Sequence, residues 1–326
     1  MKLVELVVAS GKGGVGKSTI SGSLAVLLAR KGFKLVAADT DAEEPNLHIV
    51  LGIDRWDRVE EYYEGRIAYI LQDKCTKCNI CAEVCPFGAV EVIDGDYRIN
   101  EYICEGCVTC SLACPAKAIR YRFGIVAGHI MFAEKTKYGF PLVSGELIPG
   151  RPNSGKLVTE VKNRAKAILG SEGVLLLDAA AGIGCQVISS LTGAQFALLV
   201  IEPTKASLSD LKRIHKLTKH FMIAPMLVIN KYDINPEMIG KIEEYAKEEN
   251  IPIVGKIPFD ESVPNSINMG KLVVEAFPDS SASRELKRIA DFIAEEVLSN
   301  WRAWYSKYRP KKHEPYIPVI IRPQRG

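Results

Sequence analysis

A glycine-rich loop close to the first residue constrains the fold of this chain more than any other feature. The loop, GKGGVGKST at residues 11–19, follows an apolar run at residues 2–10 and precedes a helical pattern that ends at Gly32. Its pattern G-x-x-x-x-G-K-[ST] is met by Gly11, Gly16, Lys17 and Ser18. A second apolar run at residues 35–39 completes the order strand, loop, helix, strand, which predicts a nucleotide-binding P-loop in an α/β fold.

Such a loop offers backbone N–H groups and the positive end of a helix dipole to a polyphosphate. We expect nucleotide contacts from the loop residues Gly11, Gly13, Gly14, Val15, Gly16, Lys17, Ser18 and Thr19. Lys17 is expected to hold the β- and γ-phosphates, while the Ser18 hydroxyl binds Mg²⁺. Asp39 and Asp178 each end an apolar run and are predicted to bind Mg²⁺. Either Asp39 or Asp41 is a candidate to orient the attacking water.

Alternation of strands and helices resumes in the second half of the chain. Strand patterns occur at residues 174–178, 196–202, 226–230 and 252–257, and helical patterns at residues 205–220, 236–249 and 283–301. The stretch before them, which includes GELIPGRPNSG, is predicted to be rich in loops. The sequence therefore predicts a mostly parallel-sheet α/β P-loop domain, residues 1–65 and 123–300, interrupted by an inserted α+β domain at residues 66–122.

Cysteine spacing predicts the chemistry of the insert. Eight of the nine cysteines form the run C-x2-C-x2-C-x3-C-P twice, 29 residues apart. Zinc ribbons use separated pairs of cysteines, whereas this triplet run is typical of two-cluster iron–sulfur proteins in which the fourth cysteine binds the other cluster. The predicted ligands are Cys75, Cys78, Cys81 and Cys114 for [4Fe–4S] cluster I, and Cys104, Cys107, Cys110 and Cys85 for cluster II. Cys185 stands alone and is expected to be a small buried thiol, with a transient metal contact as the alternative.

Composition favours a globular cytoplasmic protein. Apolar residues make up 47% and charged residues 25% of the chain, and no apolar run is long enough to span a membrane or to act as a secretion signal. Residues 301–326 form a basic, proline-rich tail, expected to be solvated or to lie along the surface or, alternatively, to dock an acidic partner or nucleic acid. We expect neither nucleic acid nor a membrane as a partner.

The GKGGVGKST loop, the DTD at residues 39–41 and the DAAAGIG at residues 178–184 resemble the MinD superfamily of P-loop ATPases, which includes the nitrogenase iron protein and Mrp-type iron–sulfur carriers. The insert resembles a bacterial two-cluster ferredoxin, and MinD-like ATPases with such an insert are a known family. The resemblance implies a weak ATPase that dimerises through its nucleotide face, as a homodimer or with a paralogous subunit. It further implies that Lys12 reaches the partner's nucleotide in trans and that Asp41 orients the water.

The resemblance also bears on the nucleotide base. It implies adenine contacts from Asn230, Pro258 and Asp260, although the run Asn230–Asp233 also matches the N-K-x-D pattern that reads guanine in GTPases. We favour ATP over GTP.

Three functions follow from these expectations. The first is an ATP-gated electron carrier that passes electrons to a redox partner through two [4Fe–4S] clusters. The alternative is an assembly ATPase that delivers an iron–sulfur or related metallocluster to a client protein. MinD-like positioning on membranes is the third and is disfavoured because the proline-rich tail lacks an amphipathic membrane-binding end.

Overall fold

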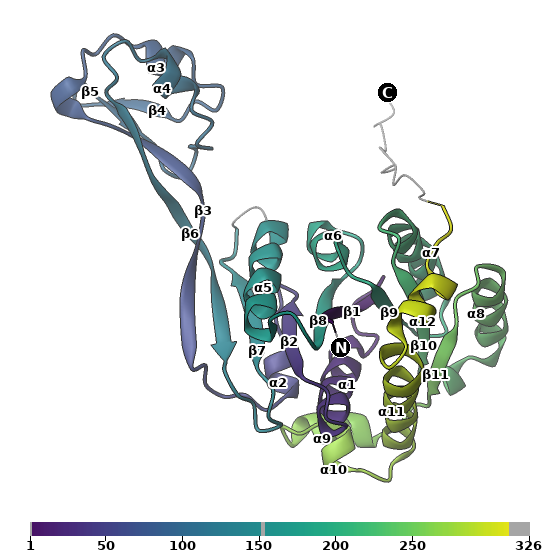
Figure 1. Cartoon of the computed structure of the whole chain (residues 1–326). Coiled ribbons are helices and arrows are strands. Elements are labelled where there is room, and N and C mark those ends of the chain that lie inside the picture. Colours follow the sequence, from purple (N-terminus) through teal and green to yellow (C-terminus); the bar gives the residue numbers. More distant parts are fainter. Residues whose placement is uncertain (1, 151–153, 313–326) are drawn as a thin grey trace. The chain divides into compact units, whose positions relative to one another are not determined.

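The chain folds into two compact units (Figure 1). The computed structural model describes residues 2–150 and 154–312. One unit contains residues up to Val59 and from Ile130 onward, and the other is the segment Glu60–His129. The first unit contains the P-loop, and the second contains the two cysteine runs.

Strands and helices alternate through most of the first unit. The strands are β1 (Val4–Ser10), β2 (Leu35–Thr40), β3 (Arg58–Ile70), β4 (Val90–Ile93), β5 (Asp96–Ile99), β6 (Ile119–Ala133), β7 (Leu142–Leu147), β8 (Val174–Ala181), β9 (Phe196–Ile201), β10 (Ala224–Asn230) and β11 (Ile253–Ile257). The helices are α1 (Lys17–Arg30), α2 (Leu47–Val50), α3 (Ile80–Glu83), α4 (Thr109–Ala113), α5 (Ser154–Leu169), α6 (Cys185–Leu191), α7 (Lys205–His220), α8 (Pro236–Glu248), α9 (Ser262–Asn268), α10 (Val273–Ala276), α11 (Ser281–Phe292) and α12 (Trp301–Tyr308). Short 3₁₀ turns occur at Gln72–Lys74 and Tyr232–Ile234, and a π-helical turn at Ile293–Leu298.

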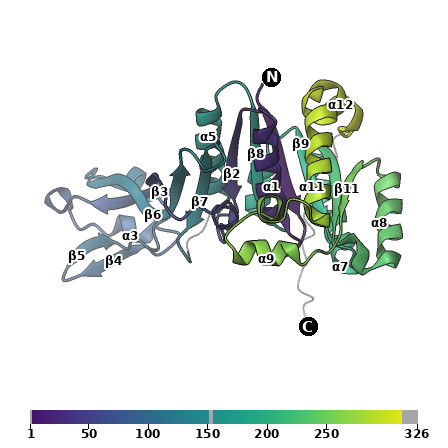
Figure 2. The ribbon, with the colours of Figure 1, turned by 90° about the horizontal axis from the view of Figure 1, so that it is seen from below.

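The strands pair in the order β11-β10-β9-β1-β8-β2-β7-β6-β3, and those from β11 to β7 form the centre of the first unit (Figures 1 and 2). The pairs from β11 through β7 are all parallel. Parallel strands buried on both faces are expected to be continuously apolar, as β9 is, and β1 is buried throughout and apolar except for Glu5 and Ser10. The predicted mostly parallel α/β fold is therefore confirmed, and the order places the P-loop strand β1 beside β8, which carries Asp178.

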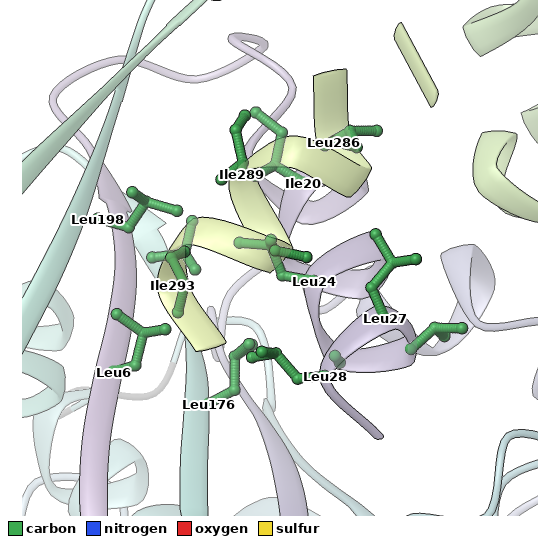
Figure 3. Packing of buried hydrophobic residues seen from close by; sticks show 14 of the residues in the cluster. Leu6, Ile20, Leu24, Leu27, Leu28, Leu176, Leu198, Leu286, Ile289 and Ile293 are labelled. Carbon is green, nitrogen blue, oxygen red and sulfur yellow. The ribbon is translucent and has the colours of Figure 1, made fainter. Parts of the chain in front are cut away.

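Helices α1 and α11 pack on one face of the sheet. Figure 3 shows Leu24 of α1 and Ile289 of α11 close to Leu6, Leu176 and Leu198 of three adjacent strands. All of these side chains are buried, and each contributes about 1.5–3 kcal/mol relative to an exposed position. The opposite face is covered by α5, because a Cβ on Gly145 of β7 would lie 2.5 Å from Val161 of that helix. This packing fixes where α1 begins and therefore where the P-loop lies.

The last helical segment differs from the single helix predicted at residues 283–301. Helix α11 ends in the π-helical turn, and the chain leaves helical geometry at Asn300 before α12 begins. The break lets Trp304 pack edge-on against Phe292, with ring centroids 5.4 Å apart, and lets the Tyr305 hydroxyl donate to the Met222 carbonyl. The predicted tail therefore starts as a packed helix, and its residues 313–326 lie outside the described part of the chain.

The insert was only partly predicted. Strands β3 and β6 extend well beyond the predicted boundaries, to Arg58 on one side and Ala133 on the other, and β7 lies in the stretch predicted to be loops. The first part of β3, residues 58–66, is exposed or half-buried on both faces. It therefore lacks the alternation of apolar and polar residues that predicts a strand. Strands β4 and β5 form a separate antiparallel hairpin.

The two cysteine runs share a backbone conformation as well as a spacing. Left-handed residues recur 29 positions apart as the pairs Lys77 and Gly106, Asn79 and Val108, and Gly88 and Lys117. Val108, at φ 66°, precedes α4 in the place that Asn79, at φ 65°, occupies before α3. A β-branched residue is disfavoured in this conformation, whereas asparagine tolerates it.

We predict that Val108→Asn stabilises the insert by about 1 kcal/mol, because it relieves a left-handed valine. The reciprocal change Asn79→Val is the matched control and should destabilise the insert by a similar amount. Amide hydrogen exchange of α3 and α4 measures both changes. If protection from hydrogen exchange is unchanged in Val108→Asn, the left-handed conformation of Val108 does not lower the stability of the insert.

Candidate functional site

The P-loop connects β1 to α1 with two glycines in left-handed conformations. Gly14 has φ 77° and Gly16 has φ 87°, and α1 begins directly afterwards at Lys17. A Cβ on Gly16 would lie 2.5 Å from Nδ2 of Asn230, so only glycine fits there. The same Asn230 amide donates to the carbonyl of Val15 at 2.8 Å. In this structure Asn230, predicted to contact adenine, therefore holds the loop in place.

The first glycine of the loop also has a close neighbour. A Cβ on Gly11 would lie 2.4 Å from Cβ of Asp210 on α7. Sequence reasoning did not single out Asp210, because its proximity depends on the packing of α7 beside the loop. Lys12, next in the chain, is exposed, as a residue that reaches another subunit must be.

A buried ion pair links the loop to β8. Nζ of Lys17 lies 3.1 Å from Oδ1 of Asp178, and neither side chain is more than one-tenth exposed. Ser21, one helical turn after Lys17, donates to the same oxygen at 2.8 Å. Burial alone would lower the pKa of Lys17, but its attraction to Asp178 and Asp39 outweighs burial and raises it. Lysine therefore stays charged at this depth.

The second carboxylate oxygen of Asp178 is open to a ligand. Oδ2 is buried and has no hydrogen-bond partner within the described residues. Ser18, the predicted hydroxyl ligand of Mg²⁺, follows Lys17 directly on α1. A buried carboxylate oxygen without a partner is unfavourable unless a ligand supplies one, and oxygen is the donor that Mg²⁺ prefers. These residues therefore fit a magnesium ion bound with a nucleotide.

Asp39 lies beside Asp178 on the neighbouring strand. The two residues are in register in the pairing of β2 with β8, and neither has any exposed surface. Asp39 accepts hydrogen bonds from the backbone N–H groups of Asp41, Asn46 and Leu47. Burial, followed by repulsion from Asp178, raises the pKa of Asp39 to about 7. A divalent cation would remove this repulsion, so the pair suits magnesium better than it suits an empty site.

Asp41 lies at the mouth of the same site. It is partly buried, and burial raises the pKa of its carboxyl group despite the attraction of Lys17. The structure thus brings the loop, Asp39, Asp41 and Asp178 together. It adds Gln186 of α6, whose side-chain oxygen accepts from the backbone N–H of Ala42 at 2.7 Å. Ser21 could have been found from its helical spacing to Lys17, but no sequence signal marks Gln186.

The residues predicted to contact the base have structural partners. Asp260 accepts from the Ser281 hydroxyl at 2.6 Å and the Ala282 N–H at 2.9 Å, and so fixes the start of α11. Burial would raise the pKa of Asp260, but these hydrogen bonds and one from Ser262 lower it below its ordinary value. Pro258 lies in the loop that follows β11, and the next residue, Phe259, donates its N–H to Asp233.

Two cavities in the insert, each of about 20 Å³, are each lined by four cysteines. The cysteines of the first cavity are Cys75, Cys78, Cys81 and Cys114. Those of the second are Cys85, Cys104, Cys107 and Cys110. In each set, three thiols come from one run and the fourth comes from the other.

Backbone donors accompany the fourth cysteines. The N–H of Ala89 lies 3.3 Å from Sγ of Cys85, and that of Ala118 lies 3.4 Å from Sγ of Cys114. Within residues 2–150 and 154–312, however, no three His, Cys, Asp or Glu side chains converge on a point as ligands of one metal ion do. Cys185, expected to be buried, is exposed at the start of α6.

None of the helices within the described residues combines the length and the apolar character needed to cross a bilayer.

Comparison with known proteins identifies the nucleotide-binding unit. The family model described as CobQ/CobB/MinD/ParA nucleotide binding domain matches residues 6–273. An uncharacterised protein of Methanocaldococcus jannaschii is 34% identical over 90% of this chain and 98% of its own length. An uncharacterised ATP-binding protein of the same organism is 24% identical over 98% of this chain and 96% of its own.

A solved structure shows the same fold. The septum site-determining protein MinD of Pyrococcus horikoshii, complexed with Mg-ADP, aligns with a TM-score of 0.56 and 18% identity, over 91% of this chain and 98% of that one. One of these relatives is named as ATP-binding, and none of the three names mentions iron–sulfur clusters or electron transfer. The chain belongs to the CobQ/CobB/MinD/ParA family of P-loop nucleotide-binding proteins.

Proposed function

We propose that this chain is a dimeric, ATP-hydrolysing switch whose insert, residues 66–122, holds two [4Fe–4S] clusters, and that the nucleotide state controls electron transfer through them. The observation that supports the clusters is the composition of the two cavities. Each is lined by the four cysteines that the crossed ligand pattern of two-cluster iron–sulfur proteins requires.

The cavities suit iron–sulfur clusters better than single ions. Each thiolate of a [4Fe–4S] cluster binds a different iron, so the four sulfurs stand around a cage and need not converge on one point. Left-handed residues such as Lys77 and Asn79 turn backbone N–H groups into concave sites of the kind that bind anionic groups, including iron–sulfur clusters. The N–H groups of Ala89 and Ala118 stabilise negative charge on Cys85 and Cys114. When bound, the clusters supply one-electron redox couples.

The ATPase mechanism follows from the buried ion pair. Lys17 pairs with Asp178 in this structure and would bind the β- and γ-phosphates of a nucleotide, while Asp178, Asp39 and Ser18 would hold Mg²⁺. Asp41 orients the attacking water at the mouth of the site. The exposed Lys12 places its charge on the nucleotide of the second subunit, where negative charge accumulates during phosphoryl transfer.

ATP is the proposed nucleotide. One relative is named an ATP-binding protein, and a structural neighbour binds Mg-ADP. Asn230 contributes by holding the P-loop, and the proposed base contacts come from Asn230, Pro258 and Asp260.

MinD-like positioning is the second candidate function, because the structural neighbour is a MinD protein and no relative named above is described as an electron carrier. Delivery of a metallocluster to a client protein is the third. The three functions differ in the property that nucleotide binding changes. Electron transfer requires a change in the reduction potential of the clusters, positioning requires a change in the location of the protein, and delivery requires a change in how tightly the cluster is held.

The crossed ligand pattern predicts which variants lose the same cluster. Cys114 belongs to the second run but lines the first cavity, so Cys114→Ala should lose the cluster that Cys75→Ala loses. Protein prepared without oxygen should contain about eight irons per chain and each variant about four. Iron and sulfide analysis with EPR of the reduced protein measures this.

Cys185→Ala is the matched control and should keep all the iron, because Cys185 lines neither cavity. An EPR spectrum of Cys114→Ala that matches Cys104→Ala would refute the crossed pattern. Zinc in place of iron would refute the clusters altogether.

Nucleotide control predicts that binding changes the reduction potential of the clusters. A redox titration with a non-hydrolysable ATP analogue should differ from one with ADP, and about 59 mV corresponds to a tenfold change in a one-electron equilibrium. Lys12→Ala should still bind the analogue but lose both the shift and ATP turnover, because it breaks the contact between subunits. Identical potentials in all states would favour MinD-like positioning or cluster delivery.

A further inference from the structure

A third polar residue shares the register of the two buried carboxylates. Ser144 of β7 pairs with Asp39 of β2, which in turn pairs with Asp178 of β8. Residues in register on adjacent parallel strands point to the same face of the sheet. None of the three has any exposed surface.

The neighbour of Ser144 shows which face this is. Gly145 faces α5, since a Cβ there would meet Val161 and Leu157 of that helix. Successive strand residues point to opposite faces, so Ser144 faces the side of α1 and α2. This is the side from which α1 contacts Asp178 and from which the N–H groups at the start of α2 contact Asp39.

The hydroxyl of Ser144 has no hydrogen-bond partner among residues 2–150 and 154–312. Asp178 Oδ2 and Asn46 Oδ1 on neighbouring segments are also buried without one. Buried polar atoms normally have hydrogen-bond partners. Three buried polar atoms without partners on segments next to Asp39 therefore indicate that a ligand completes their hydrogen bonds. Magnesium accounts for Asp178 Oδ2, but no predicted role accounts for Ser144.

We propose that Ser144 is a further positioning residue of the magnesium–nucleotide site. Its hydroxyl hydrogen-bonds within the hydration shell that Asp39 holds around Mg²⁺, and so fixes Asp39 for cation binding. Mg²⁺ bound in proteins usually keeps several of its waters, which need acceptors and donors from the protein. The inference rests on the proposed binding of Mg²⁺ with nucleotide.

The test measures binding of the fluorescent analogue mant-ADP to the full chain as Mg²⁺ is varied. Ser144→Ala should raise the Mg²⁺ concentration at half-saturation about three- to tenfold, the loss expected for one hydrogen bond, without changing the affinity for mant-ADP in EDTA. Ser144→Thr, which keeps the hydroxyl, should restore the wild-type value. Ser23→Ala is the matched control, because its hydroxyl is also buried and unpartnered in the described chain but lies within α1.

Thermal unfolding without nucleotide separates a structural role from a positioning role. Removing an unpartnered buried hydroxyl should leave both alanine variants at least as stable as the wild type. If Ser144→Ala reaches half-saturation at the same Mg²⁺ concentration as the wild type, the inference is overturned. If mant-ADP binding to the wild-type protein does not depend on Mg²⁺, the magnesium site itself is overturned. If Ser144→Ala does not fold, Ser144→Cys, a weaker donor of similar size, takes the same measurement.

Discussion

Repulsion between two buried carboxylates governs the nucleotide-binding unit. Asp39 and Asp178 lie in register on adjacent central strands without exposed surface, and Lys17 is the cation paired with Asp178 in the described structure. This arrangement is favourable only with a cation close to both groups. Lys17 supplies that charge in this structure, and under the proposed function Mg²⁺ would supply it beside a bound nucleotide. The strand order that places β1 and β2 on either side of β8 is therefore what makes the P-loop functional.

The cysteine cavities of the insert also depend on residues that come from separate segments. The two runs share spacing and left-handed positions, yet neither supplies four cysteines to one cavity. Each cavity takes its fourth thiol from the other run, so the proposed metal binding at either cavity would fix both runs relative to each other. Binding free energy of this kind contributes directly to folding in small metal-binding units.

Sequence patterns predicted the elements whose chemistry is local. The P-loop, the parallel strands and the duplicated run each depend on residues close together in the chain. Sequence patterns missed contacts between distant segments. Asn230 and Asp260, predicted to contact adenine, also hold backbone elements in this structure, and the helix break at Asn300 accompanies the packing of Trp304 on Phe292. Cys185 was expected to be buried because small thiols usually are, but it lies on the exposed start of a short helix.

The sequence by itself determined that this chain has a phosphate-binding loop and predicted two sets of four cysteines, since spacing along the chain specifies both. Only the tertiary structure decided that Asp39, Asp178 and Ser144 form one buried row, because strands far apart in the sequence become neighbours through the parallel sheet. Register across a sheet depends on the packing of both its faces, and no short segment contains that information.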